Sequence, residues 1–134
     1  MTKKIILSPD APAPIGPYSQ AVEVNNTLYV SGQIALSVFE AGGTIEEETN
    51  QVMLNLQHLL TAAGYDFNQV VKCSIFVKDM NHFAQINEVY GRYFSVNPPA
   101  RETVEVARLP KDVRVEISCS TPKFSRKRDL SQKI

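Results

Sequence analysis

The fold is decided by residues 70–77, which read Val70-Val71-Lys72-Cys73-Ser74-Ile75-Phe76-Val77. Every odd-numbered position in this stretch is apolar, which is the period-two pattern of a strand with a buried face. Val70 and Phe76 make the opposite face apolar as well. A strand that is apolar on both faces needs cover on both sides. We therefore expect helices on one side of its sheet and a second copy of the chain on the other. The copies would form a closed cyclic oligomer with ligand sites in the clefts between subunits.

The segments on either side of this strand predict the other strands of a sheet. Residues 21–24 and 28–34 flank Asn25-Asn26, whose side chains tolerate positive φ, and this pattern predicts a hairpin. Gly32, inside the second strand of the hairpin, predicts a bulge or a close approach of another group to the backbone. Downstream, alternating residues predict strands over 101–107 and 113–120, and we expect these two strands to pair with each other.

Two helices accompany the strands. Thr44 followed by Glu47 has the form of a capping box, and apolar residues then recur at helical spacing until Gly64 supplies a left-handed stop. The second helix begins near Asn81 and cannot continue through Pro98-Pro99. Two helices can cover only one face of a sheet this wide. The predicted fold class is therefore α+β, a sheet of about six strands with two helices packed on one face.

Composition indicates one globular domain. The chain has 134 residues, of which 43% are hydrophobic and 21% charged, and both fractions are close to globular averages. No apolar run approaches the roughly 18–20 residues of a membrane helix, and the apolar part of the N-terminus is too short for a secretory signal. We therefore expect a soluble, cytoplasmic protein.

Charge separates the domain from its C-terminus. Residues 1–122 hold nine Lys/Arg and thirteen Asp/Glu, whereas residues 123–134 hold five basic residues and one acidic residue. We expect a single domain over 1–122 and a basic, mobile tail over 123–134. An acidic domain does not favour nucleic-acid binding, which needs a concentrated basic face.

Polar residues on the last two predicted strands form the candidate site. Period two puts Arg101 and Thr103 on one face of the first strand, and Arg114, Glu116 and Ser118 on one face of the second. If the strands pair, a guanidinium, a hydroxyl and a carboxylate share one surface. Arginine binds a carboxylate through two parallel hydrogen bonds, and a glutamate can orient or deprotonate a water. The alternative is an ordinary solvated sheet face with cross-strand ion pairs.

Few other residues suggest chemistry. The four prolines within residues 9–17 set an extended path that holds Tyr18 in place, so Tyr18 is either a site residue or an ordinary interface aromatic. Cys73 and Cys119 lie in strand-like runs without metal-ligand spacing, and we expect buried, reduced thiols. Neither histidine has a second ligand one helical turn away, so no metal site is expected.

Five stretches of the sequence together resemble the reactive intermediate deaminase family, also called RidA or YjgF. They are Ala13-Pro14-Ile15-Gly16-Pro17-Tyr18-Ser19-Gln20, Val30-Ser31-Gly32-Gln33-Ile34, Phe76-Val77-Lys78-Asp79-Met80, Pro99-Ala100-Arg101 and Val104-Glu105-Val106-Ala107-Arg108-Leu109-Pro110-Lys111-Asp112. They occur in the family's order, and the resemblance covers about residues 3–122. It implies a chorismate-mutase-like α+β fold assembled as a homotrimer, with ligand sites between subunits.

The resemblance also implies an activity. Family members like this one hydrolyse reactive enamine/imine intermediates, such as 2-iminobutanoate and 2-iminopropanoate, to 2-oxo acids and ammonia. This chemistry prevents damage to pyridoxal-phosphate enzymes. By motif, Arg101 is implied to hold the substrate carboxylate and Glu116 to position the attacking water. The implied pocket residues are Tyr18, Ser31, Gly32 and, at its edge on the second helix, Asn87. No cofactor is implied, and the implied partners are a small 2-imino or 2-oxo acid and further copies of the chain.

One residue departs from the family pattern. Thr103 stands where the best-known members carry a cysteine beside the arginine, so a thiol nucleophile is unavailable here. We expect the Thr103 hydroxyl to serve as a hydrogen-bonding group of the pocket. The rival interpretation is a non-catalytic sensor that binds 2-oxo acids or amino acids at the subunit interface. A ribonuclease, reported for relatives of this fold, ranks last and predicts salt-sensitive RNA binding through residues 123–134.

Overall fold

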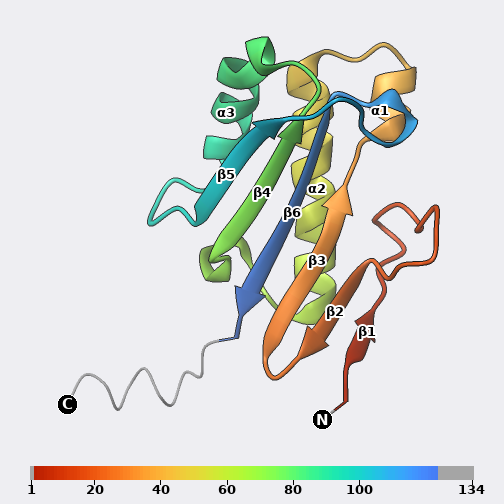
Figure 1. Cartoon of the computed structure of the whole chain (residues 1–134). Helices are drawn as coiled ribbons and strands as arrows, with labels where there is room; N and C mark the ends of the chain where they lie inside the picture. Colours follow the sequence, from red (N-terminus) through yellow and green to blue (C-terminus); the bar gives the residue numbers. More distant parts are fainter. Residues whose placement is uncertain (1, 124–134) are drawn as a thin grey trace.

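A computed structural model describes residues 2–123 of the chain (Figure 1). The strands are β1 (Lys4–Ile6), β2 (Ala21–Val24), β3 (Thr27–Gln33), β4 (Lys72–Val77), β5 (Ala100–Glu105) and β6 (Val115–Pro122). The α-helices are α1 (Leu36–Glu40), α2 (Ile45–Ala63) and α3 (Phe83–Gly91), and single 3-10 turns cover Phe67–Gln69, Met80–His82 and Pro110–Asp112. The basic segment predicted as a tail lies, apart from Lys123, outside the described residues.

The six strands form one sheet in the order β1-β2-β3-β6-β4-β5. Neighbours are antiparallel except for β4 and β5, which run parallel. The helices α2 and α3 lie on the same face of the sheet (Figure 1), and the core fills the space between them, with Leu28, Met53, Leu56, Ile75 and Ile117 almost fully buried. The predicted α+β class, with about six strands and helices on one face, is confirmed. No helix within residues 2–123 is long and apolar enough to span a membrane.

Most local predictions are confirmed because they rest on backbone chemistry. Asn25 and Asn26 adopt φ of 51° and 57° in the tight turn between β2 and β3. The Thr44 side chain accepts a hydrogen bond from the backbone of Glu47, whose side chain accepts one in return, so the capping box starts α2. Gly64 ends this helix at φ 83°. The short helix α1 was not expected from the sequence, and its N-cap has no side-chain hydrogen bond.

The predicted pairing of the last two strands is wrong. The strand β4 lies between β5 and β6, and β6 pairs with β3 on its other side. In the registers, Arg101 stands beside the buried Cys73, whereas Glu116 stands beside Phe76. Because neighbouring residues of a strand point to opposite faces, Arg101 projects to the helix-covered face and Glu116 to the other. Alternation correctly predicted which residues share a face within each strand. It cannot predict which faces of two strands coincide when the strands are not neighbours in the sheet.

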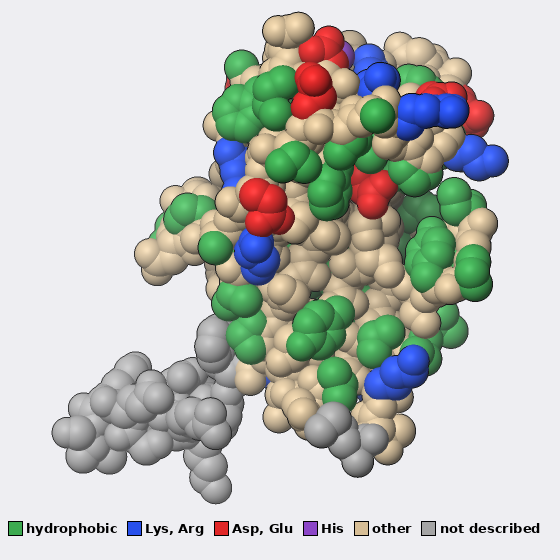
Figure 2. All heavy atoms as spheres, in the orientation of Figure 1, with side chains coloured by type: hydrophobic (Ala, Val, Ile, Leu, Met, Phe, Trp, Pro, Cys, Tyr) green, Lys and Arg blue, Asp and Glu red, His purple; other side chains and the backbone are tan. Residues whose placement is uncertain are grey.

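The second face of the sheet carries no α-helix among the described residues (Figure 1). Hydrophobic side chains are spread over it in Figure 2, and Tyr29 and Val104 are 53% and 39% exposed. A Lys72–Glu102 ion pair of 2.8 Å, with Ser74 hydrogen-bonded to the same carboxylate, lies near its β5 edge. This is the face for which the sequence predicted a second copy of the chain.

Candidate functional site

One group of predicted site residues meets in a cavity of about 300 Å³ on the uncovered face. Tyr18, Ser31, Gly32 and Glu116 line it, together with Ile15, Ile34 and Pro110. These residues come from the proline-rich segment, the end of β3, the loop after β5 and the start of β6. Four of the seven residues singled out from the sequence are therefore brought together by the fold.

The proline-rich segment forms one wall of this cavity because it is tied to the sheet. The buried Gln20 carboxamide accepts from the backbone N–H of Ser8 at 2.8 Å and donates to the carbonyls of Ser8, Ala11 and Pro12. The Ser31 hydroxyl donates to the Ser19 carbonyl at 2.6 Å. These bonds fix the backbone on both sides of Tyr18, whose ring is left 47% exposed at the cavity.

Gly32 makes room for the Glu116 side chain. The register of β3 against β6 shifts between Val30 and Gln33, so the predicted irregularity is present. A Cβ atom at position 32 would lie 2.8 Å from Cδ of Glu116. The carboxylate of Glu116 therefore occupies the space that any larger residue at position 32 would need, which explains the glycine.

The Glu116 carboxylate is suited to accepting a proton. It is half-buried, and within residues 2–123 it makes no ion pair or hydrogen bond. Burial removes water from the charged form and raises the pKa of the Glu116 carboxyl above its ordinary value. A carboxylate in this state can hold a water and take its proton.

A second group surrounds Arg101 on the opposite face. The guanidinium carbon of Arg101 lies 4.9 Å from the ring centroid of Tyr90 and 5.6 Å from that of Phe83, both on α3. Asn87 lies one turn from each of these aromatic residues and so belongs to the same side of the helix. The Thr103 hydroxyl, two residues along β5, is buried without a hydrogen-bond partner among the described residues.

The two groups are not contiguous within one chain. The sequence predicted that Arg101, Thr103 and Glu116 would share a surface, and the intervening β4 and the opposite orientation of the side chains contradict this. Arg114, predicted beside Glu116, instead binds the buried Glu48 of α2 at 2.7 Å. The two groups therefore differ in charge. The Arg101 group offers a cationic donor on one face of the sheet, and the Glu116 group offers a carboxylate acceptor on the other.

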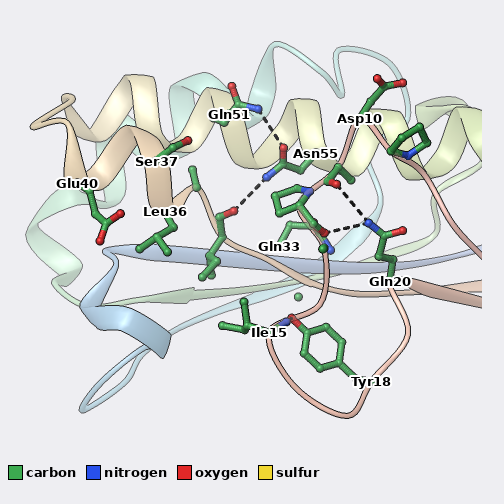
Figure 3. Close-up of a pocket in the computed structure, with 17 residues that line it drawn as sticks. Asp10, Ile15, Tyr18, Gln20, Gln33, Leu36, Ser37, Glu40, Gln51 and Asn55 are labelled. Atoms are coloured by element: carbon green, nitrogen blue, oxygen red, sulfur yellow. Dashed lines mark hydrogen bonds between the residues drawn. The ribbon is translucent and has the colours of Figure 1, made fainter.

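A larger cavity of about 510 Å³ lies behind the proline-rich segment (Figure 3). It shares Ile15, Tyr18, Gly32 and Ile34 with the Glu116 cavity, and α1 and α2 close its far side. Its buried Asn55 donates to the Ile34 carbonyl at 3.0 Å and accepts from Gln51. These bonds hold the chain immediately after β3 and keep the wall between the two cavities in place.

Sequence reasoning missed two residues that shape the Arg101 group. Phe83 and Tyr90 are apolar-stripe residues of α3, and such a stripe in the sequence does not reveal that a cation lies against it. Both cysteines are free and buried, as predicted. No group of three or more His, Cys, Asp or Glu side chains within residues 2–123 is arranged to hold a metal ion.

Comparison with known proteins identifies related sequences. A family model described as endoribonuclease L-PSP matches residues 8–121. The 2-iminobutanoate/2-iminopropanoate deaminase of Mus musculus is 48% identical over 118 residues, covering 86% of this chain and 87% of the mouse protein. A RutC family protein of Synechocystis is 50% identical over 124 residues, which cover 89% and 95% of the two chains.

A solved structure extends the similarity to three dimensions. The crystal structure of E. coli TdcF with bound serine superposes with a TM-score of 0.85 at 36% identity. The match covers 90% of this chain and 99% of the TdcF chain. The sheet, the helices and the segments that carry the two groups therefore belong to a fold already observed in a protein that binds a small amino acid.

Proposed function

The chain belongs to the endoribonuclease L-PSP family, also known as the YjgF/RidA family, and on this premise we propose that it is a deaminase of small 2-imino acids. It would hydrolyse enamine/imine intermediates such as 2-iminobutanoate and 2-iminopropanoate to 2-oxo acids and ammonia. The observation that carries the proposal is the pair of unengaged charges, the Arg101 guanidinium and the half-buried Glu116 carboxylate. A substrate with a carboxylate beside an electrophilic C=N carbon needs both. Removal of such intermediates would protect pyridoxal-phosphate enzymes.

Arg101 supplies the anchor for the substrate carboxylate. Its guanidinium has no ion pair or hydrogen bond within residues 2–123, so its N–H donors are available to form two parallel bonds. Asn87, on the side of α3 that carries Phe83 and Tyr90, and the unpartnered Thr103 hydroxyl, on the same face of β5 as Arg101, would complete this end of the site.

Glu116 supplies the base. A water held by its carboxylate adds to the C=N carbon, so a C–O bond forms while the water proton passes to Glu116 and then to the nitrogen. In the second half, the new hydroxyl loses its proton to Glu116, the C–N bond breaks, and ammonia leaves with that proton. The products are the 2-oxo acid and ammonia, and neither a cofactor nor a metal is required. General-base catalysis of this kind contributes about 10²–10⁴-fold.

The site requires more than one copy of the chain. Arg101 and Glu116 lie on opposite faces of one protomer, and the uncovered face is apolar at Tyr29 and Val104. We propose a homotrimer in which Arg101 of one protomer meets the cavity of Tyr18, Ser31, Gly32 and Glu116 of its neighbour. This arrangement replaces the single shared surface that the sequence predicted.

Two other functions are the alternatives to deamination. A non-catalytic sensor of amino acids is favoured by the serine bound to TdcF, because that ligand occupies a protein of this fold. An endoribonuclease is favoured by the family's description, but the domain over 1–122 carries a net charge of −4, which opposes binding of a polyanion. A direct assay separates the three.

The decisive experiment couples the protein to threonine dehydratase and threonine. We expect 2-oxobutanoate and ammonia to appear faster with the wild-type chain, and kcat to fall about 10²-fold or more with Glu116→Gln. Binding of 2-oxobutanoate without any acceleration would support the sensor instead. Cleavage of RNA without acceleration would support the ribonuclease.

Complementation tests whether two protomers share each site. Arg101→Ala and Glu116→Gln should each be nearly inactive as pure proteins. When the two variants are refolded together at equal concentration, random mixing in a ring gives sites with both native groups, and about a quarter of the wild-type rate should return. If the mixture stays as inactive as its components, Arg101 and Glu116 do not act in one shared site.

A further inference from the structure

The Arg101 side chain is held in an unusual way. Within residues 2–123 no carboxylate pairs with it and no carbonyl accepts from it, yet it is half-buried. The rings of Tyr90 and Phe83 lie against its guanidinium, with centroids 4.9 Å and 5.6 Å from the guanidinium carbon. A cation over an aromatic face is attracted by the electrons of the ring and gives up none of its N–H donors.

Of the two rings, that of Tyr90 is the fixed one. Tyr90 is 4% exposed, whereas Phe83 is 37% exposed. The Tyr90 ring packs against Phe94 with centroids 4.8 Å apart, and Phe94 meets Phe67 edge-on at 5.2 Å. The direct contact with Phe94 immobilises the Tyr90 ring, so it can serve as a rigid support.

The Tyr90 hydroxyl has no part in that packing. It is buried beside the thiol of Cys73 and has no hydrogen-bond partner of ordinary geometry among the described residues. A thiol is only a weak donor and acceptor. The ring is therefore the part of Tyr90 that acts on Arg101.

We propose that Tyr90 is a positioning residue for the deaminase, whose ring holds the Arg101 guanidinium in the orientation that binds the substrate carboxylate. The inference rests on the proposed function. An aromatic ring orients the Arg101 guanidinium, as the Glu48 carboxylate orients that of Arg114. A carboxylate partner would neutralise Arg101 and occupy its donors before the substrate arrived. A ring fixes the position of the guanidinium and leaves its charge and its donors for the ligand.

The test compares three variants in the threonine dehydratase assay. Tyr90→Leu removes the ring, and we expect KM to rise about tenfold while kcat changes less than about twofold, because a carboxylate anchor acts equally on the bound substrate and the transition state. Tyr90→Phe keeps the ring and should restore KM to within about twofold of wild type. Phe67→Leu removes an aromatic from the same cluster without touching Arg101, and KM should stay at the wild-type value.

Direct binding provides the second readout. Calorimetry with 2-oxobutanoate, which keeps the carboxylate but cannot react, should show the same tenfold weakening for Tyr90→Leu and recovery for Tyr90→Phe. In an Arg101→Ala background, Tyr90→Leu should have no further effect on Kd, because the ring would then have no guanidinium to hold.

The outcomes separate the two proposals. If the wild-type chain turns over and binds normally, and Tyr90→Leu matches it in KM and Kd, the positioning role is wrong and the deaminase stands. If Phe67→Leu raises KM as much as Tyr90→Leu, the effect belongs to general packing and the positioning role is equally wrong. If the wild-type chain binds 2-oxobutanoate without turnover, the deaminase fails, and the ring is then tested by Kd alone. If it neither turns over nor binds 2-oxobutanoate, both proposals fail together.

Discussion

Two arginine–glutamate combinations differ in how their charges are used, Arg114 with Glu48 and Arg101 with Glu116. Arg114 and Glu48 form a closed pair. The Arg114 Nε donates to one oxygen of Glu48 at 2.7 Å, and the Arg114 backbone N–H donates to the other at 2.8 Å. A terminal guanidinium nitrogen of Arg114 reaches the Gly43 carbonyl at 2.6 Å. Arg101 and Glu116, the open combination, form no pair within residues 2–123, and each lies partly exposed on its own face of the sheet.

This difference distinguishes a structural charge from a functional one. The Glu48 side chain is fully buried and that of Arg114 is 26% exposed, so their bonds join α2 to the start of β6. A buried pair with its hydrogen bonds complete has no capacity left for a ligand. Arg101 and Glu116 retain that capacity. Burial raises the pKa of the Glu116 carboxyl, because no cation stabilises its charged form.

The largest expected effect comes from breaking the closed pair. Arg114→Ala leaves Glu48 buried without its cation and should lower the free energy of unfolding by about 3–5 kcal/mol. Urea unfolding at fixed protomer concentration measures it. The double variant Glu48→Gln/Arg114→Met, which removes both charges and keeps an acceptor for the backbone N–H, should recover most of the loss. If Arg114→Ala is as stable as wild type, the pair is not what joins α2 to β6.

Breaking the open combination should instead remove activity. Arg101→Ala deletes the carboxylate anchor and should lower kcat/KM about 10²-fold, since a charged hydrogen bond contributes about 1.5–3 kcal/mol. Its unfolding curve should stay close to wild type, because within residues 2–123 Arg101 makes no ion pair or hydrogen bond and loses its contacts with the Tyr90 and Phe83 rings. Arg101→Lys keeps the positive charge but lacks the planar guanidinium, so its kcat/KM should lie between those of Arg101→Ala and wild type. Unchanged turnover in Arg101→Ala would contradict the anchor role.

Crowding the Glu116 half gives a smaller effect. In Gly32→Ala the new methyl group meets the Glu116 side chain, so the carboxylate must move while the backbone stays in place. We expect kcat to fall about tenfold with little change in KM, because the water is misplaced and the carboxylate anchor is intact. Gly91→Ala, where the added methyl group meets nothing within 4 Å, is the matched control. Equal kcat values for Gly32→Ala and wild type would show that the glycine does not serve Glu116.

The pH profile examines the same carboxylate without moving it. Glu116 must be ionised to act as a base, and its pKa is raised by burial, so kcat should begin to fall at a higher pH than for an ordinary carboxyl. The same shift means that the folded chain prefers the protonated form, so ionisation destabilises the fold as pH rises through the raised pKa. Glu116→Gln should therefore be inactive and slightly more stable than wild type at neutral pH. A kcat profile flat down to the ordinary carboxyl range would contradict this role for Glu116.

The sequence predicted the residues of the open combination but not their arrangement. Alternation placed Arg101 with Thr103, and Glu116 with Ser118, and the turn and cap residues Asn25, Thr44 and Gly64 fixed the local elements. Strand order is a different matter, because it depends on which edge offers the better partner to β6. The strand β4, which is apolar on both faces, pairs with β6 in place of β5. No local sequence pattern near residue 101 predicts this pairing.

The closed pair was missed for a related reason. Glu48 lies in the first turns of α2 among Glu46 and Glu47, where acidic residues favour the helix N-terminus and give no reason to suspect burial. Arg114 looked like a neighbour of Glu116 in an alternating strand. Its actual partner lies 66 residues away along the chain, and only the packing of α2 on the sheet brings the two together.

The smallest effect is expected at Thr103, which lies two residues from Arg101 on the same face of β5. Its buried hydroxyl has no partner within residues 2–123, so Thr103→Val should be as stable as wild type or slightly more stable. If the hydroxyl serves the substrate held by Arg101, KM should nevertheless rise about threefold, and Thr103→Ser should restore it. Thr103→Cys, which introduces the residue that the family resemblance places here, should leave kcat within about threefold, because the proposed route uses water and no thiol nucleophile. A large gain in kcat for Thr103→Cys would mean that a thiol takes part in the chemistry of this fold, and that Glu116 alone does not account for the reaction.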